Sequence, residues 1–448
     1  MKKHFKSWFG LLAVALSIGV ALPASGAVSS GIVDKMFIQA GTGAVSRPYS
    51  AKLGDVISVE DYGAVGDGVA DDTAKIQAAI NHLQSGASGA IRFKSGKTYR
   101  ITGTVYTNNR SIVLDGNNAI LLVGANMTYG LSINGTNTEV RNLQINRAPA
   151  ATVTAAVYMT GLQHVVRNVT SRAQVWPVFI LAQDLKESHF SNIRVDNDPT
   201  NRTGIVFKFD YSVNNTVSES MLGFAAQAFY GSSTGQPSSG YHNEGLLISN
   251  VIVVYAGKAV NFDNGTFIAI VNSCFDFIEN IGVFMSNGTD LNVMNTWIAS
   301  NQTNGFIGVG TTSAVDGVSL QNNVFVRGAA PITGTAGVSL SGPNVLVIGN
   351  RFKSGMNGGV VTQSTGQVIG NNVSGGGTNI VANASAATVL GKLAVEGTLT
   401  VGTSQGIFPT GLSGSASAGG NGAAPAQVAG YATVVIGGTS YKIPYYGL

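Results

Sequence analysis

The sequence predicts an all-β protein built from short strands and tight turns, and two observations support this. Only 11% of its 448 residues are charged, whereas 59 are glycine, and asparagine, serine, threonine and valine recur throughout. This composition favours strands and turns over amphipathic helices. Short apolar segments that contain an asparagine recur at intervals of 21 to 28 residues, with one longer interval of 35. Such a regular interval is typical of structural repeats that stack on one another.

The repeated segments run from VRNLQI to IGNNVS. Their asparagines are Asn142, Asn168, Asn192, Asn215, Asn250, Asn272, Asn295, Asn322, Asn350 and Asn371. In a stack of turns these residues would form one column, in which each side-chain amide bonds to the turns above and below. We therefore expect them to have a structural role.

The first 27 residues have the features of a secretory signal peptide. Three lysines lie within the first six residues, an apolar run extends from Trp8 to Leu22, and small residues follow at Ser25 and Ala27. This order predicts cleavage after Ala27 and a secreted, periplasmic or cell-surface protein. A membrane anchor is the alternative, but the apolar run is short for one.

Charge and cysteine content exclude some classes of function. The net charge of +4 falls to +1 once the three lysines of the signal peptide are removed. Because no cluster of Lys or Arg remains, no nucleic-acid partner is predicted. The single cysteine, Cys274, cannot form an internal disulfide. We expect it to be a buried small apolar residue rather than a nucleophile.

The stretch DYGAVGDGVADDTAKIQAAI is rich in aspartate and glycine. A calcium loop would need oxygen ligands at alternating positions and a downstream bidentate acid, and the aspartates lack that spacing. The pattern then becomes helical, because Ile76, Ala79, Ile80 and Leu83 share one face. Asp72 or Thr73 can cap this helix. The stretch is therefore expected to be architectural, with no metal site.

The same region carries a family resemblance. VEDYGAVGDGVADDTAKIQAAIN, followed by IRFKSGKTYRITGTV, resembles the N-terminal entry of the pectate lyase-like and polygalacturonase-like superfamily, and is closest in character to bacteriophage tailspike-type proteins. The upstream GTGAVSRPYSAKLGD resembles the lead-in of tailspike-type members, and the final GYATVVIGGTSYKIPYYGL resembles a C-terminal β element of phage tail proteins. The resemblance implies a right-handed parallel β-helix with an N-terminal capping helix, and a homotrimer.

The expected organisation follows from these features. Residues 1–27 form the signal peptide, 28–54 a lead-in segment, 55–392 the β-helix, and 393–448 a linker with a C-terminal β element. The Gly, Ala and Ser-rich segment 410–426 is typical of a flexible linker. Beyond it, a hairpin is expected around Gly437 and Gly438, which could pair between subunits.

Carboxylates that share a strand face are the first catalytic candidates. Three acids lie four residues after an asparagine of the repeat: Asp196, Glu219 and Asp276. If they share a register, Asp196 and Glu219 lie near the ~5–5.5 Å separation of retaining glycosidases, and Glu219 and Asp276 lie about 10 Å apart. Two carboxylates are needed because one protonates the leaving oxygen while the other attacks or activates water. A solvated acidic face without catalytic function is the alternative.

The longest repeat interval contains AAQAFYGSSTGQPSSGYHNEG, an insertion of small polar residues that could border a binding groove. It supplies Glu244 as a fourth catalytic candidate. Acids beside Gly or Pro are weaker candidates, because they are common in turns; these are Asp198, Asp210, Asp263 and Asp290. The candidates for substrate binding are Tyr230, Tyr241, His242, Trp176, Trp297 and Arg202. The two tryptophans could instead fill the core or a subunit interface.

These features predict an exported polysaccharide-degrading enzyme, a glycoside hydrolase that uses paired carboxylates and no cofactor. Two alternatives remain open. One is a non-catalytic carbohydrate-binding or adhesive protein on the same scaffold. The other is a uronate lyase or epimerase, for which Ca²⁺ or an arginine would neutralise the substrate carboxylate.

Overall fold

The computed structural model describes ten segments of the chain. They are residues 35–85, 89–108, 111–232, 243–300, 305–327, 336–362, 367–373, 380–383, 430–436 and 439–445. The expected signal peptide, the linker at 410–426 and the expected site residues Tyr241 and His242 lie outside these segments. The chain divides into two compact units, Met1–Thr388 and Val389–Leu448.

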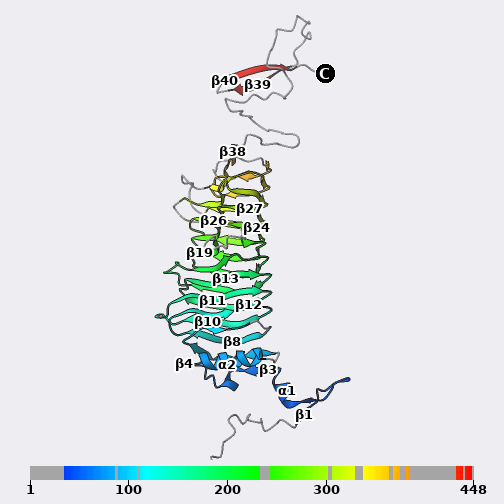
Figure 1. Cartoon of the computed structure of the whole chain (residues 1–448). Coiled ribbons are helices and arrows are strands. Elements are labelled where there is room, and N and C mark those ends of the chain that lie inside the picture. Colours follow the sequence, from blue (N-terminus) through cyan, green and yellow to red (C-terminus); the bar gives the residue numbers. More distant parts are fainter. Residues whose placement is uncertain are drawn as a thin grey trace, which may run out of the picture. The chain divides into compact units, whose positions relative to one another are not determined.

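The first unit is the predicted right-handed parallel β-helix, whose turns stack along one axis (Figure 1). Each turn contributes strands to three parallel sheets. In one representative turn, β14 (His189–Ser191) lies in the first sheet, β15 (Arg194–Asn197) in the second and β16 (Ile205–Asp210) in the third. Each of them pairs in parallel with the corresponding strand of the next turn.

The other strands follow the same order along the chain. The first sheet also contains β3 (Val56–Ser58), β5 (Ala90–Arg92), β17 (Thr216–Ser218), β20 (Asn243–Glu244), β21 (Leu247–Ser249), β24 (Gly265–Val271), β27 (Gly288–Met294), β30 (Val315–Gln321), β33 (Val345–Ile348) and β36 (Gln367–Ile369). The second also contains β4 (Asp67–Asp71), β6 (Thr98–Ile101), β18 (Met221–Gly223), β22 (Ile252–Val254), β25 (Cys274–Asp276), β28 (Trp297–Ser300), β31 (Val324–Arg327), β34 (Arg351–Lys353) and β37 (Asn372–Val373). Three long strands run through both sheets: β8 (Val113–Val123), β10 (Glu139–Arg147) and β12 (Val165–Gln174).

The third sheet carries the candidate site described below. It has 12 strands: β7 (Val105–Tyr106), β9 (Met127–Ile133), β11 (Val153–Leu162), β13 (Val178–Lys186), β16, β19 (Gln227–Ser232), β23 (Lys258–Phe262), β26 (Ile281–Met285), β29 (Ile307–Thr311), β32 (Ala336–Ser341), β35 (Gly359–Thr362) and β38 (Ile380–Asn383). Because pairing is parallel and in register, side chains from successive turns form columns that run along the stack.

The helix α2 (Thr73–Gln84) covers the first turns, as predicted, and buries Ile76, Ala79, Ile80 and Leu83. It follows a short 3₁₀ helix, η1 (Val59–Tyr62). A small N-terminal segment precedes both and contains β1 (Met36–Phe37), β2 (Arg47–Pro48) and α1 (Tyr49–Leu53).

The aspartates before α2 have the architectural role that the sequence predicts. Asp72 is at the N-cap position, but its side chain accepts hydrogen bonds from the Val65 and Gly66 amides at 2.7 and 3.1 Å. Asp71 accepts the amide of Thr73 at 3.0 Å and the hydroxyl of Thr102 at 2.5 Å. These bonds tie the helix to the turns beneath it.

The predicted asparagine column is confirmed for most of its members. Seven asparagines have φ between 50° and 55°, a left-handed conformation that asparagine tolerates better than most residues. They are Asn142, Asn168, Asn192, Asn250, Asn272, Asn295 and Asn322. The side-chain amide of Asn168 donates to the side-chain oxygen of Asn142 in the preceding turn at 2.9 Å. That of Asn192 donates to Asn168 in the same way at 2.8 Å. The column therefore fixes the bend between the first and second sheets.

Three expected members lie elsewhere. Asn215 precedes the bend, and Glu219, with φ of 51°, occupies the column position between Asn192 and Asn250. Asn350 and Asn371 lie one residue after the bend, where glycines hold the left-handed position. Their side chains belong to a second, interior ladder, in which the backbone N–H groups of Asn323 and Asn350 donate to the side-chain oxygen of the next asparagine at 2.9 and 3.0 Å.

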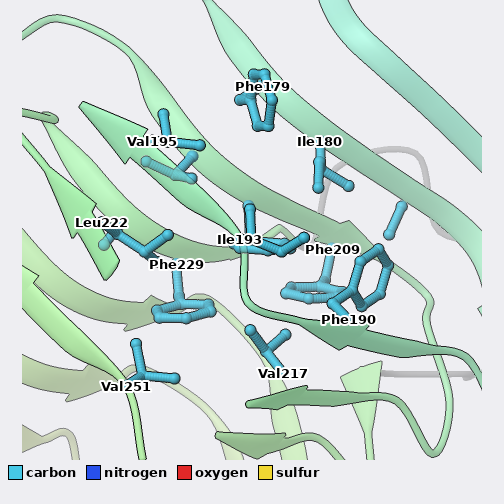
Figure 2. Close-up of a cluster of buried hydrophobic side chains, with 14 of the residues drawn as sticks. Phe179, Ile180, Phe190, Ile193, Val195, Phe209, Val217, Leu222, Phe229 and Val251 are labelled. Atoms are coloured by element: carbon cyan, nitrogen blue, oxygen red, sulfur yellow. The ribbon is translucent and has the colours of Figure 1, made fainter. Parts of the chain in front are cut away.

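The core fills the space between the three sheets. Figure 2 shows Phe190 and Phe229 among inward-pointing aliphatic side chains such as Leu222, and all three are fully buried. The ring of Phe207 stacks on that of Phe229 at 5.3 Å between centroids and meets that of Phe190 edge-on at 5.4 Å. Apolar columns of this kind hold neighbouring turns together.

In the second unit, β39 (Gly430–Ile436) pairs antiparallel with β40 (Thr439–Tyr445). This confirms the two strands of the expected hairpin, although Gly437 and Gly438 lie outside the described segments. Within the ten segments given above, no helix has the length and apolar character needed to cross a membrane.

The asparagine column generates a stability prediction. We expect Asn192→Ala to lower the free energy of unfolding by about 2 kcal/mol, because it removes a hydrogen bond and leaves a residue with a Cβ in the left-handed region. Asn192→Gly keeps the backbone conformation accessible and should lose only about 1 kcal/mol. Conversely, Glu219→Asn should stabilise the protein by about 1 kcal/mol. Guanidinium unfolding followed by circular dichroism measures all three, and equal losses for Ala and Gly would contradict this account.

A second prediction concerns acid stability. Burial opposes ionisation of Asp71, but hydrogen bonds from Thr102 and Thr73 outweigh it and lower the pKa to about 2. Because the folded pKa lies below the unfolded value, the contribution to stability is complete above pH 4 and is lost as the pH falls toward 2. Because Asp71 is exposed to solvent, we expect the free energy of unfolding to fall by only about 1 kcal/mol over this pH range. Asp71→Asn should not show this fall. Unfolding titrations at pH 7, 4 and 2.5 would show it; parallel curves for both proteins would disprove it.

Candidate functional site

The acids predicted from the asparagine register do not form a pair. Asp196 and Asp276 do share a column on the outer face of the second sheet, but Gly223 and Val254 lie between them. Three strand spacings separate the two acids by about 14 Å, which exceeds the ~6.5–9.5 Å separation in inverting glycosidases. Asp196 and Asp276 are therefore too far apart to act together as such a pair.

Glu219 is at the bend, four residues before Gly223, rather than beside Asp196. The pairing predicted from the sequence requires Asn215 to be in the column, whereas Glu219 holds that position. Glu219 is exposed and its backbone replaces an asparagine of the column. Its side chain therefore does not join Asp196 on one strand face.

Trp176 lies in the core, which is the alternative to sugar binding that the sequence leaves open for it. Its side chain is fully buried, its indole nitrogen donates to Ser171 at 2.9 Å, and its ring packs edge-on against Phe179. The ring therefore fills the core and cannot stack on a sugar.

Arg202 is held by protein groups at the corner between the second and third sheets. It bonds to Glu279 at 2.5 Å, and its guanidinium lies 5.6 and 5.4 Å from the rings of Phe224 and Tyr255. These contacts are those of a structural residue.

The remaining predicted residues lie on different parts of the surface. Trp297 is 37% exposed on the outer face of the second sheet, where its strand neighbour is the half-buried Cys274. Glu244 is half-buried in β20 and pairs with Thr266 of the first sheet. Tyr230 lies on the outer face of the third sheet, where it meets several polar groups that form the candidate site.

The third-sheet cluster consists of Lys208, Asp210, Tyr230, Ser232 and Asp263. Lys208 pairs with Tyr230, and Asp210 pairs with Ser232, across neighbouring strands. The ammonium of Lys208 lies 3.1 Å from Oδ2 of Asp210, and the hydroxyl of Tyr230 donates to Oδ2 of Asp263 at 2.6 Å. Alternate residues of β16 and β19 thus point to one face and meet there.

Asp210 is an unusual acid for a β-helix surface, because it is only 5% exposed. Burial raises its pKa, while the charge and hydrogen bond of Lys208 and a hydrogen bond from Ser232 act in the opposite direction. Its Oδ1 atom is buried without a hydrogen-bond partner in the described part of the chain. A carboxyl group in these surroundings is disposed to hold a proton and to donate it.

Tyr230 and Asp263 form the other half of the third-sheet cluster. Burial raises the pKa of Tyr230, and the hydrogen bond to Asp263 and the charge of Asp263 raise it further. The phenol therefore keeps its proton and orients the half-buried carboxylate. Asp263 in this position can accept a proton from a water or a substrate hydroxyl.

The two acids of the third-sheet cluster have a defined spacing. Asp210 pairs with Ser232, and the amide of Asp263 donates to Gly231, which places Asp263 beside Ser232 on the following strand. Two strand spacings give a backbone separation of about 9.5 Å. This strand spacing is compatible with the ~6.5–9.5 Å between the two carboxyl groups of inverting glycosidases, which leaves room for a water molecule.

Aromatic and amide groups flank the third-sheet cluster along the stack. On the N-terminal side, Tyr158 stacks on Tyr129 at 4.4 Å between centroids and donates to Gln183 at 3.2 Å. On the C-terminal side, Lys258 bonds to Asn261 at 3.1 Å and lies 6.0 Å from the ring of Phe284. Polar and aromatic side chains therefore lie on both sides of the third-sheet cluster, and Leu181 separates Tyr158 from Lys208.

The sequence ranks Asp210 and Asp263 only as weaker candidates, because acids near turns are usually structural. One signal was present: Lys208 and Asp210, like Tyr230 and Ser232, are two residues apart and so share a strand face. The sequence alone does not show that the strand of Lys208 and Asp210 pairs with the strand of Tyr230 and Ser232. No group of three or more His, Cys, Asp or Glu side chains suited to a metal ion occurs among the described residues.

The stacked turns place the chain among the single-stranded parallel β-helix proteins. Within that class it belongs to the rhamnogalacturonase A/epimerase, pectate lyase-like family, whose profile matches residues 56–284. This confirms the resemblance seen in the sequence.

Short stretches of sequence are similar to curated relatives from Azotobacter vinelandii. Mannuronan C5-epimerase AlgE5 is 39% identical over 70 residues, which are 16% of this chain and 7% of that protein. Alginate lyase 7 is 37% identical over 70 residues, which are 16% of this chain and 8% of that protein. The chain thus spans less than a tenth of the length of either relative.

Solved structures share the fold at low sequence identity. The A-module of mannuronan C-5 epimerase AlgE4 from Azotobacter vinelandii aligns with a TM-score of 0.51 and 16% identity, covering 75% of this chain and all of that one. A mutant tailspike protein of E. coli bacteriophage HK620, solved in complex with a pentasaccharide, aligns with a TM-score of 0.58 and 13% identity, covering 78% of this chain and 71% of that one.

Proposed function

We propose that the protein degrades a polysaccharide as a glycoside hydrolase, with Asp210 and Asp263 as the acid and base. The observation that carries this proposal is the pair of carboxyl groups two strands apart, one of them buried with a raised pKa. The pentasaccharide bound by the phage tailspike of similar fold supports a saccharide as the substrate.

The geometry suggests a division of roles. Protonated Asp210 donates its proton to the glycosidic oxygen as the bond to the anomeric carbon breaks. Asp263 accepts a proton from water, whose oxygen attacks the anomeric carbon from the opposite face. Tyr230 holds the Asp263 carboxylate in place, and Lys208 limits the rise in the pKa of Asp210. The products are two shorter chains, and no cofactor takes part.

A uronate epimerase or lyase is the second candidate, and Lys208 and Tyr230 favour it. An ammonium group near the substrate can neutralise a uronate carboxylate, and a phenol can exchange a proton at the adjacent carbon. The short matches to mannuronan C5-epimerases and an alginate lyase are consistent with this reaction.

The reaction can be assigned by incubating the purified full chain with alginate, polygalacturonate, rhamnogalacturonan and a neutral dextran. New reducing ends without absorbance from unsaturated uronates identify a hydrolase. Absorbance identifies a lyase, and altered mannuronate-to-guluronate ratios in the NMR spectrum of alginate identify an epimerase. Retention on a polysaccharide gel without any of these changes would identify a non-catalytic binder and overturn the proposal.

The site generates a mutational prediction. We expect Asp210→Asn and Asp263→Asn each to lower kcat by about 10²–10⁴-fold, because each removes one proton-transfer step. Asp196→Asn and Asp276→Asn are matched controls, since both acids lie on the outer face of the second sheet, and should leave kcat within about twofold of the wild type. Loss of activity in the controls with retention in the first pair would place the reaction on the second sheet instead.

A second prediction uses the pH profile. Asp210 must be protonated to act as the acid, so kcat/KM should fall as the pH rises through its pKa. Because Lys208 lowers that pKa, Lys208→Met should move the alkaline limb of the profile to higher pH by about one unit. Lys258→Met is the matched control and should leave the limb in place. A limb that stays fixed in Lys208→Met would show that Asp210 is not the titrating acid.

A further inference from the structure

We infer that Tyr129, Tyr158 and Ile205 form a platform that binds sugar units remote from the bond that is cleaved. The inference rests on the proposed function, because the same polysaccharide chain would occupy both the platform and the third-sheet cluster. It adds a binding site on the sheet that carries the third-sheet cluster.

The platform is an apolar cluster outside the core of the β-helix. Tyr129, Tyr158 and Ile205 are partly exposed, and they pack over three buried side chains of the third sheet: Ala155, Val178 and Leu181. The two tyrosine rings are nearly parallel, with an angle of 13° between them. Two neighbouring aromatic rings on an outer face present an apolar surface with polar edges, which suits the C–H face and hydroxyl rim of a sugar ring.

The platform is continuous with the third-sheet cluster. Tyr158 pairs with Leu181, Leu181 with Lys208, and Lys208 with Tyr230, so these four side chains share one outer column. Tyr158 therefore lies two strand spacings from Lys208, about 10 Å, and three from Tyr230, about 14 Å. A single monosaccharide at the acids would not reach the platform, whereas an oligosaccharide along the axis would.

Hydrogen-bonding groups line the route between the two sites. The hydroxyl of Tyr158 donates to Oε1 of Gln183, and Gln183 pairs with Asp210 on the next strand. The charge of Asp210 contributes to the raised pKa of Tyr158, although burial is the main cause. The amide of Gln183 and the ammonium of Lys208 can bind sugar hydroxyls between the platform and the acids. This chemistry fits a saccharide better than an apolar protein surface.

The test compares substrates of different length. Tyr158→Ala is expected to lower kcat/KM about tenfold on oligosaccharides of about six or more units, because the stacking surface is lost. On the shortest oligosaccharide that is cleaved, kcat/KM should remain within twofold of the wild type. Tyr158→Phe keeps the ring and should behave almost like the wild type on both substrates. The oligosaccharides are prepared from whichever polysaccharide of the panel above is degraded.

Tyr255→Ala is the matched control, because Tyr255 is also half-buried and stacked on aromatic rings, but at the corner between the second and third sheets. It should leave the length dependence unchanged. Equal losses for Tyr158→Ala on short and long substrates, or no loss on either, would overturn the inference. A change in molar mass by light scattering in Tyr158→Ala would show that the platform binds a second copy of the chain instead.

Failure of the proposed reaction is distinguishable from failure of the platform. If no polysaccharide is cleaved, the hydrolase proposal fails, and the platform is then tested by affinity electrophoresis in gels that contain each polymer. Tyr158→Ala should lose retardation there while Tyr255→Ala keeps it. Equal retardation of both variants and the wild type would reject the platform independently of catalysis.

Discussion

The left-handed bend at the asparagine column is the constraint on which the rest of the structure depends. Each turn must enter the second sheet in the same register as the turn below, or every side chain that follows would change face. The asparagines fix this register in two ways. Their backbones tolerate φ near 50°, and their side-chain amides form hydrogen bonds along the stack. Once the bend is fixed, strand pairing carries the register into the third sheet.

The candidate site is a consequence of that register. Lys208 and Asp210 come from one turn, Tyr230 and Ser232 from the next, and Asp263 from a third. No short motif joins them, because each turn of the chain separates neighbours in the site by more than 20 residues. The inward-facing side chains of each strand fill the core. The outward-facing positions are not needed for the core, so they can carry functional side chains without altering the fold.

The sequence was sufficient for the fold, the capping helix and most of the asparagine column, because each depends on local patterns. It was insufficient for the site, because a shift of one residue in the count changes which side chains meet. Counting from Asn215 placed Glu219 next to Asp196, whereas Glu219 itself occupies the bend. Asp210 and Asp263 resembled ordinary turn acids until pairing showed their neighbours. Trp176 was ambiguous between core and binding surface, and only burial decides that question.

Glu219 and Asp210 differ in how deeply their side chains are buried in the β-helix. Glu219 is exposed at a position that asparagines hold in neighbouring turns, and its backbone forms the bend there. Asp210 is buried beside a lysine, with one oxygen lacking a hydrogen-bond partner among the described residues, which costs stability. Folding alone gives no reason for a buried, incompletely bonded acid on an outer face. A proton-transfer role would give one, because the same burial that destabilises the ionised form raises the pKa of Asp210.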